Sequence, residues 1–291
     1  MTAQNSNFNQ QSTVANHTAS NAGFVDIHCH LLPAIDDGPA TMADSIALCR
    51  LLVRDRIGTV VATPHQLGKY DTKNSGKIIK EKVIELNKVL AENEIPLKVL
   101  AGADVRIDER ITSLIKSGEV LTVADNGKNL LLELPENILI NIDSLINELS
   151  QAGVKVILTH PERHQSLAIQ PQLLSNWSNK GCAIQITAGS VLGKFGSIAQ
   201  KAAWQILESG LPLIVATDSH NTDSRAPCMR AAYQMIAGHL GQQTANLVCI
   251  ENPARAIEGK EIQKIEIKNQ EMGEYGRKPN IFRRQTAEQN R

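Results

Sequence analysis

The sequence predicts a parallel α/β fold, either a (β/α) barrel or an open, doubly wound sheet. Seven short runs rich in Val, Ile and Leu alternate with helix-like segments, an order typical of repeated βαβ units. The runs do not alternate strictly between polar and apolar residues, as expected of strands buried on both faces. No Gly-x-Gly-x-x-Gly or Walker-type loop follows any run, which disfavours a nucleotide-binding open sheet.

Each expected element follows from its local pattern. Helix 41–55 carries Ile46, Leu48 and Leu51 on a helical period, and helix 77–93 has its apolar residues on one side. A glycine follows each of the other two helices, which is a usual helix stop. The expected helices are 41–55, 77–93, 142–152 and 197–209. The expected strands are 24–28, 58–63, 97–101, 129–134, 154–159, 183–187 and 212–217.

Composition excludes several classes of protein. Thirty Lys and Arg balance thirty Asp and Glu, and aromatic residues make up 3% of the 291 residues, so we expect no nucleic-acid partner. No apolar window is long enough for a transmembrane helix, and no secretory signal begins the sequence, so we expect no membrane insertion. Five scattered cysteines without a Cys-x-x-Cys pair indicate a reducing compartment, the cytoplasm.

The expected domain covers residues 23–258, with a tail on either side. Residues 1–22 contain no Asp, Glu, Lys or Arg, and we expect a disordered polar arm because too little apolar surface offsets the entropy of ordering. Residues 259–291 carry eight Lys and Arg against five Asp and Glu, and we expect a weakly basic, mobile tail. The sequence leaves the oligomeric state open, a homo-oligomer included.

Metal-binding side chains recur at one end of the expected strands. In an α/β barrel the carboxyl ends of the strands form the face where catalytic groups gather. The sixth strand, which runs into 187–190, is the exception. Imidazole and carboxylate groups without thiolates suit Mn²⁺, Fe²⁺ or Zn²⁺, and the set exceeds what one ion can use, so we expect two or three ions. The candidate metal ligands are His28, His30, Asp37, His65, Asp104, Glu133, His160, Asp218 and His220.

Spacing and context support this set. Residues i and i+2 of a strand point to the same face, so His28 and His30 can bind one ion, and Asp218 and His220 can do the same. Glu133 lies in an apolar run, where an ionised carboxylate is costly unless it is paired or binds a cation. Arg163 and Arg225 follow two of these strand ends, and paired guanidinium groups suit a phosphoryl substrate.

Other polar residues have simpler interpretations. We expect Cys29 to face the packing between layers and Asp36 to act as a helix cap or turn residue. His164 is left unassigned. The spacing Cys249 to Arg255 matches that of cysteine-dependent phosphatases, but the intervening Glu and Pro are unsuited to a phosphate loop, so we expect Asn252 to cap a last helix instead.

Taken together, these motifs resemble the polymerase and histidinol phosphatase (PHP) superfamily, and within it the bacterial CpsB/CapC type of manganese-dependent protein-tyrosine phosphatases. The resemblance covers about residues 24–258, and six motifs in one order are far more specific than any one alone. It implies a distorted, TIM-like (β/α)7 barrel that holds three metal ions. The matching stretches are 26–38, 62–65, 102–104, 132–133, 159–163 and 216–221, followed by 225–227 and 251–253.

The resemblance also implies a role for each residue. It assigns Asp104 as the bridge between the first two ions, a position where the branch usually carries Glu, and it assigns Arg163 and Arg225 to the phosphoryl oxygens. The implied sets are His28, His30, Asp104 and Asp218 for the first ion, Asp104, Glu133 and His160 for the second, and Asp37, His65 and His220 for the third.

The implied activity is metal-dependent hydrolysis of phosphotyrosine. The implied partner is the phosphotyrosine tail of a membrane-attached tyrosine autokinase, whose dephosphorylation regulates capsule or exopolysaccharide production. Two alternatives lie within the same superfamily, namely a small-molecule phosphatase of the histidinol-phosphate type and a phosphodiesterase. An alternative from another class is a noncatalytic metal-binding regulatory module.

Overall fold

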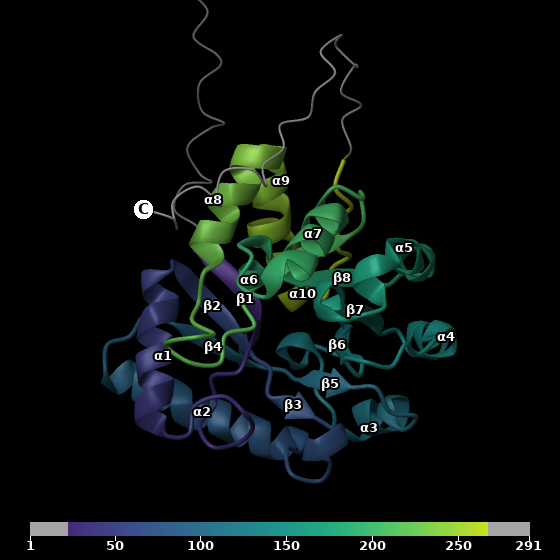
Figure 1. The fold of residues 1–291 in the computed structure, drawn as a ribbon. Coiled ribbons are helices and arrows are strands. Elements are labelled where there is room, and N and C mark those ends of the chain that lie inside the picture. The colour runs from purple at the N-terminus through teal and green to yellow at the C-terminus, as the bar shows by residue number, and fades with distance from the viewer. Residues whose placement is uncertain (1–22, 267–291) are drawn as a thin grey trace, which may run out of the picture.

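The computed structural model describes residues 23–266, and the expected polar arm (1–22) and most of the expected basic tail (267–291) lie outside this range. The described chain forms a parallel α/β barrel with helices around its outside (Figure 1). The strands are β1 (Phe24–Cys29), β2 (Ile57–Ala62), β3 (His65–Gln66), β4 (Lys98–Ala101), β5 (Asp104–Arg106), β6 (Asn129–Glu133), β7 (Lys155–Thr159), β8 (Ala183–Thr187) and β9 (Leu213–Ala216). The helices are α1 (Met42–Arg54), α2 (Gly76–Glu92), α3 (Ile111–Ser117), α4 (Asp143–Gln151), α5 (Pro171–Asn179), α6 (Ala188–Val191), α7 (Gly196–Leu207), α8 (Met229–Leu240), α9 (Gln242–Asn246) and α10 (Asn252–Ile257).

The strands follow one another around the barrel in seven positions, which we call staves, and each stave is one strand or two strands in line. The second stave is β2 continued by β3, and the third is β4 continued by β5; the breaks fall at Pro64, which has no backbone N–H, and at Gly102. Strands β1, β2 and β4 form one parallel sheet, and β3, β5, β6, β7, β8 and β9 form the other in that order. All seven expected strands are therefore present, and the two short strands β3 and β5 were not expected.

The last stave joins the first. An isolated parallel bridge links Cys29 to Ser219, and the backbone N–H of Asp218 donates to the carbonyl of His28 at 2.8 Å. Asp26 stabilises this junction, since its buried carboxyl accepts from the hydroxyl and the backbone N–H of Thr217. Burial raises the pKa of Asp26 to about 7.

Two apolar layers lie on the two faces of the strands, which explains why the strand sequences are almost continuously apolar. Alternate strand residues, among them Ile27, Val61, Leu131, Ile157 and Ile214, form the inner cluster. Their neighbours pack outward against the helices in a larger cluster. The inner cluster fills the barrel below the end where the candidate ligands lie.

Local signals explain where the helices begin. Thr41 and Asp44 form a reciprocal capping box at α1, because each side chain accepts from the backbone N–H of the other residue. Ser75 caps α2 with its side chain, which accepts from a backbone N–H of the first turn, without a reciprocal bond. The four expected helices match α1, α2, α4 and α7 within two residues at each end.

The C-terminal part of the chain differs from two expectations. Asn252 does not cap a separate helix, because α9 continues through a π-helical turn into α10 and Asn252 has helical dihedral angles. Its side chain instead binds the carbonyls of Leu213 and Gln263. Residues 259–266, expected to belong to the tail, pack on the barrel with Ile262 and Ile265 buried.

The inner cluster gives a direct test of the barrel. We expect Ile157→Ala to lower the free energy of unfolding by about 2–5 kcal/mol, because the fully buried side chain leaves a cavity among strand residues that cannot collapse. Ile84→Ala on the exposed side of α2 should change it by less than about 0.5 kcal/mol. Urea denaturation measures both, and equal effects would contradict the assignment of the inner layer.

Candidate metal centre

A β-bulge in β1 directs two histidines into the barrel. Asp26 pairs with Val60 and Cys29 pairs with Ala62, so Ile27 and His28 together lie opposite one residue of β2. Ile27 belongs to the inner cluster, and regular alternation would place His28 on the outer face. The extra residue turns His28 to the interior with His30, while Cys29 packs in the larger apolar cluster, in line with the expectation that it serves packing.

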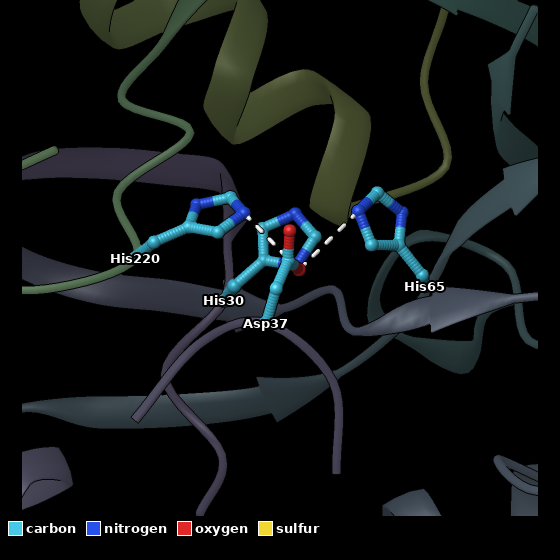
Figure 2. A group of neighbouring side chains, drawn as sticks. All are labelled: His30, Asp37, His65 and His220. Carbon is cyan, nitrogen blue, oxygen red and sulfur yellow. Dashed lines mark ion pairs between the residues drawn. The ribbon is translucent and has the colours of Figure 1, made fainter. Parts of the chain in front are cut away.

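Six of the other candidate ligands come from five further staves, and the seventh, Asp37, follows β1. His65 lies in β3, Asp104 in β5 and Glu133 at the end of β6. His160 follows β7, and Asp218 and His220 follow β9, while Asp37 lies in the loop after β1. Figure 2 shows His30, His65 and His220 gathered around Asp37, with Asp37 Oδ1 3.5 Å from Nε2 of both His65 and His220. The structure therefore brings all nine candidate ligands to one end of the barrel.

Second partners fix the orientation of three of these imidazole rings. The Nδ1–H of His28 donates to Gln185 Oε1 at 2.9 Å, and that of His30 donates to Asp36 Oδ2 at 2.6 Å. The Nδ1–H of His220 donates to the backbone carbonyl of Asp218 at 3.0 Å. With Nδ1 protonated, each ring presents the lone pair of Nε2 to the centre of the site, which is the arrangement that metal-binding histidines adopt.

These lone pairs face one another and the oxygens of neighbouring carboxylates. The Nε2 atoms of His28 and His30 lie 3.2 Å apart, and both lie within 3.5 Å of Asp218 Oδ1. The buried atoms Asp104 Oδ2 and His220 Nε2 have no hydrogen-bond partner. Because unpartnered buried acceptors are costly, this donor set fits divalent cations of the kind that nitrogen and oxygen ligands bind.

The ligand atoms form four overlapping groups. Within each group the ligand atoms lie within 4.8 Å of one another. Four residues, His28, His30, His65 and Asp104, each belong to two groups, and the groups cut across the three sets that the resemblance implies. The groups are His28, His30 and Asp104; His28, His160 and Asp218; His65, Asp104 and Glu133; and His30, Asp37, His65 and His220.

Burial and the charges of neighbouring side chains shift the pKa values of the site residues, some upward and some downward. Burial and the neighbouring imidazoles hold the pKa of His30 well below its usual range, which keeps the ring neutral as metal binding requires. Burial and the charge of Asp104 raise the pKa of Glu133 to about 7. Burial opposes protonation of His65, but the carboxylates of Asp104, Glu133 and Asp37 together outweigh burial and raise the pKa of His65 to about 9.

Both candidate arginines border the ligand cluster. Arg163 Nη1 lies 2.8 Å and Arg225 Nη2 lies 2.6 Å from the same oxygen, Asp218 Oδ2. The other oxygen of Asp218 faces the histidines. The two guanidinium groups also line a cavity of about 730 Å³ together with His65, Glu133 and His160.

The backbone is strained at two ligands. His160 has φ of 34° and Asp218 has φ of 51°, in the left-handed region that non-glycine residues rarely occupy. Such strain persists only where the surrounding structure holds it, and it gathers at functional sites. Here it directs both side chains inward from the ends of β7 and β9.

Several residues outside the predicted set support the site. Gln185 lies in the middle of the strand that was expected to contribute nothing, and a lone glutamine between two buried isoleucines was its only signal. Asp36 is a turn residue, as one alternative expected, since it accepts from the N–H of Gly38, but it also fixes His30. Arg106 Nη2 lies 3.2 Å from Glu133 Oε2.

Other candidates play no part in the cluster. His164 is buried away from it, with Nε2 bonded to the carbonyl of Ile138. Cys249 is buried within the π-helical turn, and burial raises the pKa of its thiol far above the usual range. A buried, protonated thiol inside a helix cannot act as a phosphatase nucleophile.

The fold and the side-chain set define a barrel protein with a candidate metal centre at the carboxyl ends of its strands. Residues 24–258 match the family described as "Capsular polysaccharide synthesis, CpsB/CapC". The chain belongs to this family. Among residues 23–266, none of the helices has the length and apolar character needed to cross a membrane.

Known proteins agree with this placement. The chain is 37% identical to the tyrosine-protein phosphatase YwqE of Bacillus subtilis, over 75% of this chain and 86% of that protein. It is 33% identical to the putative tyrosine-protein phosphatase CapC of Staphylococcus aureus, over 69% of this chain and 78% of that protein.

The three-dimensional comparison points to the same family. The structure matches a crystal structure from work on YwqE of Bacillus subtilis and CpsB of Streptococcus pneumoniae, described as metal-dependent tyrosine phosphatases, with a TM-score of 0.79 and 32% identity over 83% of this chain and 97% of that chain. A β-aspartyl dipeptidase from Fervidobacterium islandicum, at 17% identity over 84% of this chain and 76% of that chain with a TM-score of 0.52, shares the fold alone.

The contact between Asp36 and His30 predicts a loss of metal affinity. In Asp36→Asn, an amide NH₂ that faces Nδ1 favours the tautomer with the proton on Nε2, which removes a lone pair from the site. We expect affinity for Mn²⁺ to fall about 10–100-fold, measured by isothermal titration calorimetry. Asp143→Asn, at a surface ion pair with Lys180, is the control. Unchanged Mn²⁺ binding in folded Asp36→Asn would contradict this orienting role.

Proposed function

We propose that this chain is a metal-dependent protein-tyrosine phosphatase that hydrolyses phosphotyrosine with two or three divalent ions. The observation that carries the proposal is the set of imidazole lone pairs and carboxylates that face one another beside two arginines. Divalent cations held by these imidazoles and carboxylates would supply charge neutralisation for a phosphoryl group and lower the pKa of an attacking water. The activity of the relatives YwqE and CpsB supports the same reaction.

We assign the ligands as the family pattern implies. The nearest atoms are consistent with Asp104 as a bridging ligand, since its Oδ2 lies 3.7 Å from His28 Nε2, 3.3 Å from His65 Nδ1 and 4.0 Å from His160 Nε2. Thr159 donates to the other oxygen of Asp104 and limits its rotation. The proposed ligands are His28, His30, Asp104 and Asp218 for the first ion, Asp104, Glu133 and His160 for the second, and Asp37, His65 and His220 for the third.

The arginines hold the phosphoryl group. Each guanidinium uses one terminal nitrogen on Asp218 Oδ2 and has further N–H donors at the border of the cavity. A phosphoryl group placed there accepts from both side chains, and Arg163 and Arg225 neutralise the charge that its equatorial oxygens carry in the transition state. The phenol of tyrosine, with a pKa of about 10, leaves without a strong general acid.

The finer assignments rest on the family and on ligand chemistry. Imidazole and carboxylate ligands suit Mn²⁺, with Fe²⁺ or Zn²⁺ as the other ions of this class. The substrate is the phosphotyrosine tail of a membrane-attached tyrosine autokinase, met in the cytoplasm, and its dephosphorylation regulates capsule or exopolysaccharide production. The five cysteines are buried and unpaired, as is usual for proteins of the cytoplasm.

Metal removal tests the reaction class. Treatment with EDTA should abolish hydrolysis of a phosphotyrosine peptide, and added Mn²⁺ should restore it. Cys249→Ser should retain activity, because the thiol is buried and protonated. Activity that survives EDTA but is lost in folded Cys249→Ser would contradict the proposal. Comparison with histidinol phosphate separates the peptide phosphatase from a small-molecule phosphatase.

The arginines predict a defined kinetic loss. Arg225→Met should lower kcat/KM for phenyl phosphate about 100-fold, the usual cost of one donor to a transition-state oxyanion. Arg225→Lys should recover part of this loss, because an ammonium keeps the charge but not the planar fork. Arg110→Met, at a surface ion pair with Asp71 and Asp108, is the control. Full activity in Arg225→Met would exclude Arg225 from phosphoryl binding.

A further inference from the structure

Exposed apolar side chains gather beside the metal site. Eight large hydrophobic residues are exposed in the described chain, and five of them lie on the connections that follow β6, β7 and β8. Ile169 is 71% exposed, Ile198 is 70% exposed and Phe195 is 37% exposed. Single exposed hydrophobic residues are ordinary, but a contiguous group marks an interaction surface.

Three of the five residues form one wall of the cavity that holds the arginines. Phe195 and Ile198 lie at the start of α7, and Ile169 ends a short 3-10 turn that follows β7. All three line the cavity of about 730 Å³ with Arg163 and Arg225. We call Ile169, Phe195 and Ile198 the apolar wall.

The apolar wall is continuous with the proposed phosphoryl site. The guanidinium of Arg163 lies over the ring of Phe195, 4.8 Å from its centroid. The same guanidinium lies 2.8 Å from Asp218. A group attached to a phosphoryl bound at Arg163 would therefore lie near Phe195, which lines the same cavity as the two isoleucines.

We propose that the apolar wall binds an apolar side chain next to the phosphotyrosine of the substrate peptide. This inference rests on the proposed function and adds a sequence preference to it. The cavity is lined on the far side of β6 by two cationic side chains, Lys69 in the turn after β3 and Arg106 in β5. Peptides with apolar neighbours at the phosphotyrosine therefore gain contacts at Ile169 and Ile198 that peptides with serine neighbours lack.

The position of the wall favours a substrate peptide over a second copy of this chain. The wall lines a recess that contains metal ligands and both arginines, among them His65, His160 and Asp218. A second copy seated on Ile169 and Ile198 would cover that recess and block access to the site. A peptide carries its phosphorylated side chain into the recess while its neighbouring residues contact the rim.

Binding without turnover tests the wall directly. Two peptides carry a non-hydrolysable phosphonate analogue of phosphotyrosine, one flanked by leucines and the other by serines. Fluorescence anisotropy with Mn²⁺-loaded protein should give a Kd about tenfold lower for the leucine-flanked peptide. The double variant Ile169→Ser/Ile198→Ser should lose this preference. Ile84→Ser on α2, where the residue is also 71% exposed but does not line the cavity, should keep it.

Turnover separates failure of the wall from failure of the function. Hydrolysable versions of both peptides and phenyl phosphate are assayed with wild-type protein and Mn²⁺. The preference should appear in KM and should vanish in the double variant. Turnover of phenyl phosphate with equal Kd and KM for both peptides overturns the wall alone. Absence of all turnover overturns the wall and the proposed function together. If the double variant changes its oligomeric state without a change in peptide Kd, the wall serves self-association, and this result also overturns the inference.

Discussion

The close approach of the His28 and His30 Nε2 lone pairs, 3.2 Å apart beside Asp218, is the interaction on which the rest of the site depends. Each lone pair is fixed by a hydrogen bond at the opposite nitrogen, from His28 to Gln185 and from His30 to Asp36. Acceptors that face one another in a buried site repel unless positive charge lies between them. In the function proposed above divalent cations supply that charge, and the fold gives the ligands little freedom to turn away.

The barrel makes this concentration of polar groups tolerable. Apolar strand residues fill the interior below the site, and the histidines and carboxylates occupy only the end where the staves open. The hydrogen bonds of Asp26 with Thr217 hold β1 beside β9, which places His28 next to Asp218. Strain at His160 and Asp218 is maintained by the same packing.

Much of this arrangement follows from the sequence. The strand positions were predictable because buried parallel strands give long apolar runs, and the ligands were predictable because polar residues that end such runs meet at one face. The bulge at Ile27 and His28 was not, because pairing register is set between strands and leaves no mark in β1 alone.

The supporting residues show a second limit. Gln185 and Asp36 act through contacts with residues 157 and 6 positions away, and short-range spacing does not show which buried polar group meets which ring. The apolar wall also escaped prediction, because Ile169, Phe195 and Ile198 come from two connections whose packing brings them to one cavity. Sequence periodicity identifies the apolar face of a single helix or strand, whereas the apolar wall is formed by residues from two separate connections.

The central claim is that these facing lone pairs bind a cation. Anomalous diffraction from crystals grown with Mn²⁺ measures this most directly, because the signal locates manganese without reference to activity. The account predicts a peak within coordination distance of Nε2 of both His28 and His30. An ordered site with both rings in place and no anomalous peak between them would contradict it.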